Sequence, residues 1–144
     1  SMSPGSGSRV KSSKLINMHD FDQLVPLISP NAIFWFNDGS FCGLKQIRQA
    51  FEETWKKFPL ENYWLENLEW VAQSKDCAGC TYHFRWRAIL NGSALEGGGR
   101  GTTILRREAN VWKITHEHLS QFPKQDPKGR QLPSRSLGLR QKRS

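Results

Sequence analysis

The sequence predicts an α+β fold in which a strongly bent antiparallel sheet packs against helices from the N-terminal part of the chain. Two observations predict it. Apolar residues recur at helical spacing over 44–58, and residues 62–121 alternate between apolar and polar in runs separated by turn signals. The predicted order is helix, hairpin, helix and then a long antiparallel meander, which is typical of α+β proteins.

The first elements precede the amphipathic helix. Residues 15–28 suit one helix or two short ones, because Pro26 interrupts helical hydrogen bonding unless it lies in a first turn. Residues 32–36 form a short, almost continuously apolar strand. The turn at 37–39 leads into a brief antiparallel partner at 41–42.

The helix over 44–58 has one apolar and one charged face, and Pro59 ends it. The strands of the meander alternate instead. In the second of them one face holds Cys80, Tyr82, Phe84, Trp86 and Ala88, and the other holds Thr81, His83, Arg85 and Arg87. Residues 97–99 are expected to be a flexible glycine segment that leads into a strand over 102–107. The last strand covers 111–120.

One helix covers only part of four long twisted strands. Either the sheet wraps the helices into a cone with a cavity, or a partner chain covers the surface that remains. Both outcomes stay open at this point.

Charge is distributed unevenly along the 144 residues. The whole chain has a net charge of +8, yet residues 15–123 hold 11 basic and 12 acidic side chains. We therefore predict a disordered tail over 1–14, with a tag remnant at its start, one domain over 15–122 and a disordered basic tail over 123–144. Nucleic acid is not an expected partner, because that function normally needs a basic face on the fold.

No run of apolar residues is long enough to span a membrane, and the first residues lack an apolar signal segment. These features predict a cytoplasmic protein. The three cysteines are then expected to be reduced thiols.

Several segments resemble the SnoaL-like branch of the nuclear transport factor 2-like superfamily, which has a cystatin-like fold. They include Ala32-Ile33-Phe34 and the closing pattern Trp112-x-Ile114-x-His116-x-His118-x-Ser120. The chain is also similar to the association domain of calcium/calmodulin-dependent protein kinase. The resemblance covers about residues 15–121. It implies a cone-shaped sheet wrapped around helices, an open pocket at the wide end and homodimers formed through the outer face of the sheet.

The resemblance also bears on the pocket residues. Several arginines line the pocket of the kinase association domain. One of these arginine positions corresponds to Arg85 of this chain, whereas two others correspond to Thr103 and Leu119. Arg85 and Thr103 are therefore the ligand-binding residues that the resemblance implies, without a full arginine cluster. Trp35 is a third candidate, as an aromatic pocket wall at the end of its strand.

Candidate catalytic residues come from the strands near the expected cavity. They are His83, His116, Glu117 and His118. His116 and His118 share one face of the last strand, where one of them would serve as a general base, and Glu117 lies on the opposite face. Neither a metal nor a cofactor is expected.

Two functions follow from these expectations. The first is binding of a small, mostly apolar organic molecule, with cofactor-free isomerase, cyclase or dehydratase-like chemistry in a dry pocket. The alternative is a non-catalytic, homo-oligomeric interaction module, which associates through its aromatic outer face and meets acidic partners through its basic tail.

Overall fold

The computed structural model describes residues 12–124 and residue 128. Residues 12–16 are helical, and the last three residues of the predicted tail over 1–14 lie in this helix. The remainder of that tail, and the basic tail apart from 123, 124 and 128, lie outside the described residues.

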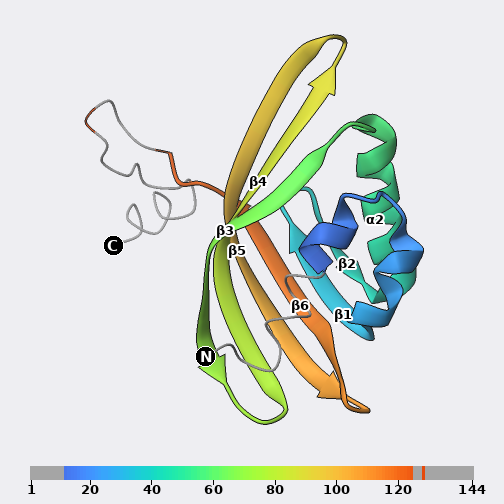
Figure 1. Ribbon diagram of the computed structural model, residues 1–144, viewed down its shortest axis with the longest axis vertical. Coiled ribbons are helices and arrows are strands. Elements are labelled where there is room, and N and C mark those ends of the chain that lie inside the picture. Colours follow the sequence, from blue (N-terminus) through green and yellow to red (C-terminus); the bar gives the residue numbers. More distant parts are fainter. Residues whose placement is uncertain (1–11, 125–127, 129–144) are drawn as a thin grey trace, which may run out of the picture.

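A curled sheet of six strands holds the helices on one side (Figure 1). Two short 3₁₀ helices precede the first strand, and a single long helix follows the hairpin. The elements are η1 (Phe21–Gln23), η2 (Val25–Leu27), β1 (Ile28–Phe36), β2 (Gly39–Cys42), α2 (Gly43–Lys57), β3 (Asn62–Gln73), β4 (Cys77–Leu90), β5 (Ser93–Glu108) and β6 (Val111–Gln121).

The strand order is β2-β1-β6-β5-β4-β3. The meander from β3 to β6 is antiparallel throughout, as the sequence predicts. However, β1 runs parallel to β6, which makes the sheet mixed rather than wholly antiparallel. The chain between them contains α2 and four strands, and a connection this long permits either direction.

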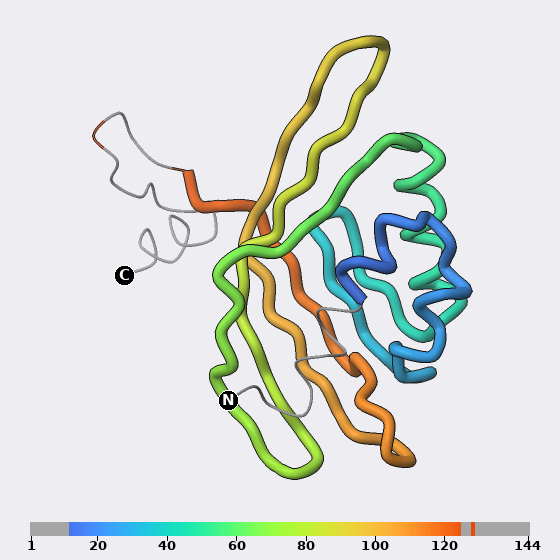
Figure 2. The backbone as a smooth tube through the Cα atoms, in the orientation of Figure 1, coloured from blue at the N-terminus to red at the C-terminus, as the bar shows by residue number. Residues whose placement is uncertain are grey.

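Figure 2 shows the helices against the concave face of the sheet. The main core lies between these two layers. Ile47 and Trp55 of α2 are buried there against Phe34 of β1 and Leu105 of β5. Lys56 and Lys57 lie in the last turn of α2, where positive charge suits the carboxyl end of the helix dipole. The predicted amphipathic helix is thus confirmed.

The glycine segment is not a flexible lead into a strand. Residues 97–101 lie within β5, which is continuous from Ser93 to Glu108. Gly97, Gly99 and Gly101 each pair with an aromatic residue of β4, and a Cβ at each would overlap that aromatic ring. Glycine is needed here because the rings of β4 fold flat over the backbone of β5.

The described residues contain no helix that is both long and apolar enough to cross a membrane.

Candidate functional site

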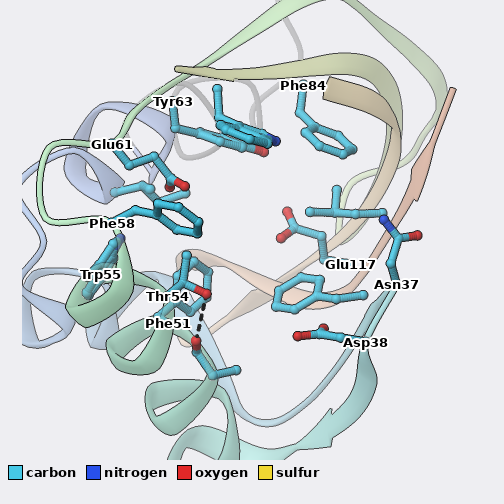
Figure 3. A pocket seen from close by; sticks show the side chains of 15 residues that line it. Asn37, Asp38, Phe51, Thr54, Trp55, Phe58, Glu61, Tyr63, Phe84 and Glu117 are labelled. Atoms are coloured by element: carbon cyan, nitrogen blue, oxygen red, sulfur yellow. Dashed lines mark hydrogen bonds between the residues drawn. The ribbon is translucent and has the colours of Figure 1, made fainter. Parts of the chain in front are cut away.

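A cavity of about 300 Å³ opens between α2 and the concave face of the sheet (Figure 3). This volume is at the small end of the range of ligand pockets, about 300–1,000 Å³. Among the described residues that line it, seven are aromatic and three are carboxylates. The described lining residues are Ile16, Phe36, Asn37, Asp38, Ala50, Phe51, Thr54, Trp55, Phe58, Glu61, Tyr63, Phe84, Trp86, Glu117 and Leu119.

The periodicity of each element explains how these side chains converge. Phe51, Trp55 and Phe58 lie three or four residues apart, which places them on one face of α2 and its end. Phe84 and Trp86 are two residues apart on β4, so both point to the concave face. The cavity is therefore an apolar space walled by aromatic rings from both layers.

Glu117 is the most deeply buried charged residue of the cavity, with 3% of its surface exposed. The Tyr82 hydroxyl donates to its Oε1 atom at 3.0 Å, and the Thr103 hydroxyl donates to the same atom at 3.1 Å. The two hydroxyl oxygens are themselves 2.8 Å apart. Both hydroxyls donate to one carboxylate oxygen, so this arrangement fixes the Glu117 carboxyl group beside an apolar space.

Glu61 lies at another side of the cavity, at the entrance to β3. Burial raises the pKa of its carboxyl above the usual range. The local backbone is fixed by His19, whose Nε2 atom lies 3.0 Å from the Glu61 carbonyl oxygen and whose ring stacks on Trp55.

The raised pKa of Glu61 predicts how stability depends on pH. Folding favours the protonated carboxyl. This contribution is fully present below the pKa of an unfolded glutamate and is lost as the pH rises through the higher folded pKa. Glu61→Gln stays neutral, so its free energy of unfolding should exceed the wild-type value at neutral pH and match it in acid. Urea denaturation at several pH values measures this difference, and a difference that does not change with pH would contradict the assignment.

Two of the residues predicted from the sequence face this cavity side of the sheet. Glu117 lines the cavity, and Thr103, which is fully buried, reaches it through its hydrogen bond to Glu117. Both side chains point to the same face of the sheet, because Thr103 of β5 and Glu117 of β6 are direct cross-strand partners.

The other predicted residues lie on the convex face. Trp35 is 44% exposed, and its ring meets those of His116 and His118 at centroid distances of 4.9 and 5.3 Å. The Nδ1 atom of His116 lies 2.7 Å from the Ile33 carbonyl oxygen. Trp35 therefore forms an aromatic cluster outside the cavity rather than a wall of it.

Arg85 and His83 also project from the convex face of β4. Arg85 donates to Glu66 at 3.0 Å and lies over the Phe122 ring, and His83 meets the edge of that ring. His83 and His118 share a polar hollow on this face with Arg100, so the structure brings these two histidines to one place, but apart from Glu117.

Sequence reasoning did not single out Tyr82, Asp38 or Glu61 as site residues. Tyr82 was recognisable as an inward residue, because it alternates in phase with Cys80 and Phe84 on β4. Asp38 lies in the turn between β1 and β2, and Glu61 lies just before β3. No local pattern marks such loop residues as lining one cavity, because only the curl of the sheet brings them to it.

Among the described residues, no group of three or more histidine, cysteine, aspartate or glutamate side chains is arranged to hold a metal ion.

Comparison with protein-family models gives one match, to a SnoaL-like domain over residues 12–125. No curated protein matches the sequence.

Solved structures share the fold. A nuclear transport factor 2-like superfamily protein from Salmonella enterica superposes with a TM-score of 0.76 and 21% identity, covering 85% of this chain and 91% of that one. The association domain of Caenorhabditis elegans calcium/calmodulin-dependent protein kinase II gives 0.64 and 17%, covering 78% and 91%. A protein with a cystatin-like fold from Caulobacter vibrioides gives 0.69 and 15%, covering 86% and 92%. At these identities the likeness concerns the fold.

Proposed function

The chain belongs to the SnoaL-like domain family, and from this premise we propose that it binds a small, mostly apolar organic molecule in the cavity and moves a proton on it with Glu117. The observation that carries the proposal is the buried carboxylate of Glu117, held by Tyr82 and Thr103 beside aromatic walls. One acid–base group in a water-poor pocket is sufficient for cofactor-free isomerase, cyclase or dehydratase-like chemistry.

The residues predicted from the sequence fall into two groups, one on each face of the sheet. Glu117 is the proton acceptor, and Thr103 positions it. His83, His116, His118, Trp35 and Arg85 lie on the opposite face of the sheet and have no part in this site. A positioning role for Thr103 is supported by its complete burial and its direct bond to the carboxylate.

Filling the cavity tests ligand binding without knowledge of the natural ligand. Ala50 lines the cavity from α2, so Ala50→Phe places a ring in a space of about 300 Å³. A neutral aromatic probe, phenethyl alcohol, is expected to perturb the indole N–H resonances of Trp55 and Trp86 in the wild type, and to lose at least about tenfold in affinity in the variant.

An exposed control is Gln49→Phe, which adds the same ring next to Ala50 on the outer side of α2. It should bind the probe as the wild type does. Equal binding by Ala50→Phe and the wild type would show that the probe does not enter the cavity.

The second candidate function is self-association through the convex face. Ile33, Trp35 and Ile104 are between 37% and 44% exposed and lie on β1 and β5, on either side of β6. We propose that a second copy of this chain covers them, as a homodimer. The fold shared with a kinase association domain supports this proposal.

Light scattering checks the dimer. Trp35→Glu should convert a dimer into a monomer at micromolar concentration, because it would bury an unpaired charge at the interface. Leu60→Glu adds the same charge at an exposed site between α2 and β3 and should leave the dimer intact. A wild-type protein that elutes as a monomer would exclude this candidate.

We extend the proposal to a cytoplasmic location. All three cysteines, Cys42, Cys77 and Cys80, lie among the described residues, and none forms a disulfide there.

A further inference from the structure

The charged groups of the cavity are all of one sign. Asp38 is exposed at the mouth, Glu61 is half-buried at one side, and Glu117 is buried in the interior. No lysine, arginine or histidine is among the described residues that line the cavity. Figure 3 shows the Glu61 and Glu117 carboxylates on different sides of the same space.

The outer two carboxylates have no partner among the described residues. Within the part of the chain that the structure describes, neither the Asp38 nor the Glu61 side chain takes part in a hydrogen bond or an ion pair. Burial raises the pKa of the Glu61 carboxyl, which shows that its surroundings do little to stabilise its charge. A bound positive charge would supply that stabilisation.

The walls of the cavity favour the same charge. The rings of Phe51, Trp55, Phe58, Tyr63 and Phe84 present π-faces or edges to the space, and π-faces attract cations more strongly once water is excluded. Phe58 already has the Lys57 ammonium 5.4 Å from its ring centroid. An anionic ligand would meet carboxylates and negative ring faces together.

We propose that the ligand of this cavity is an organic cation, a protonated amine or quaternary ammonium group on a small apolar body. This inference rests on the proposed function, because it assigns the substrate class of the same site. The cation would lie between the aromatic rings, in the field of the Glu61 and Asp38 carboxylates on the two sides of the cavity, while the apolar body fills the space between α2 and the sheet.

Three probes of similar size and different charge test the proposal by calorimetry at neutral pH. They are phenethylammonium, phenethyl alcohol and hydrocinnamate. Phenethylammonium is expected to bind at least about tenfold more tightly than the neutral alcohol, and hydrocinnamate more weakly than either. Glu61→Gln and Asp38→Asn should each lower the ratio of amine to alcohol affinity several-fold and change alcohol binding little.

Matched variants locate the effect. Glu69→Gln removes one negative charge from the polar hollow on the convex face and should leave the ratio unchanged. Ala50→Phe fills the cavity and should abolish binding of the amine. Amine binding that survives this substitution would place the cation elsewhere and overturn the inference.

The outcomes separate the two proposals. If the alcohol or hydrocinnamate binds as tightly as the amine, the inference about charge is wrong and ligand binding in the cavity stands. If none of the three probes binds, the proposed function fails together with the inference.

Discussion

Glu117→Gln should lower the rate at which the protein catalyses ring opening of nitrobenzisoxazole by at least about 100-fold. This flat, uncharged probe reacts by loss of one carbon-bound proton to a base. It reports general-base catalysis without the natural substrate. Glutamine has nearly the same shape as glutamate, and its carbonyl oxygen can still accept from Tyr82 and Thr103. It cannot take up the proton.

Ring opening of the probe needs a base but no cofactor. The carboxylate takes the proton, the electrons of the C–H bond form the nitrile, and the N–O bond breaks to release a coloured phenolate. Glu117 then returns its proton to water. The apolar walls exclude water from the reacting atoms, so the cavity should accelerate this step over acetate in water.

The control is Glu69→Gln, which removes a carboxylate from the convex face and should keep the wild-type rate. Circular dichroism must show that both variants are folded. Equal rates for the wild type and Glu117→Gln would exclude Glu117 as the base. A loss that is equal in both variants would point to a general effect of charge rather than to a residue in the cavity.

Much of the fold was predictable because two periodicities are strong. The apolar face of α2 repeats at helical spacing, and Cys80, Tyr82 and Phe84 of β4 alternate with polar residues, so each element has one evident buried face. The same alternation separates Glu117 from His116 and His118 on β6. Which of these two faces lines the cavity depends on the curl of the sheet, which no local pattern records.

The position of Trp35 was harder to predict. Residues 32–36 are almost continuously apolar, so the sequence contains no alternation to show which side chains point inward. In the structure Ala32 and Phe34 are buried, and Trp35 is exposed. In a continuously apolar strand either alternate set of side chains can face the core. Only the contacts of Phe34 with Phe36 and Phe51 show which set does so here.

The glycines of β5 were open to two interpretations. Three successive glycines are typical of a flexible segment, and the same residues permit close packing inside a strand. The second interpretation holds, because Tyr82, Phe84 and Trp86 of β4 lie directly across from glycines. The alternation of aromatic residues on β4, opposite Gly97, Gly99 and Gly101, was the signal in the sequence that could have decided it.

Gly99→Ala is therefore expected to destabilise the protein by about 3 kcal/mol or more, at the top of the range for overpacking substitutions. A Cβ at this position would overlap the Ser120 carbonyl oxygen of β6 and approach the Phe84 ring to 2.8 Å. The carbonyl belongs to the sheet backbone and cannot move without disturbing the ladder. Urea denaturation, followed by tryptophan fluorescence, measures the loss in free energy of unfolding.

The matched control is Gly79→Ala, in the neighbouring strand β4. There an added Cβ would have a single contact, 3.4 Å from the end of the Ile104 side chain, and the change should cost less than about 1 kcal/mol. If the protein tolerates Gly99→Ala as well as Gly79→Ala, β5 does not approach β6 as described.

Because Phe84 both lies over Gly99 and lines the cavity, a folded Gly99→Ala protein should also bind phenethyl alcohol more weakly. The same close approach of strands would then be needed for the stability of the sheet and for the shape of the cavity.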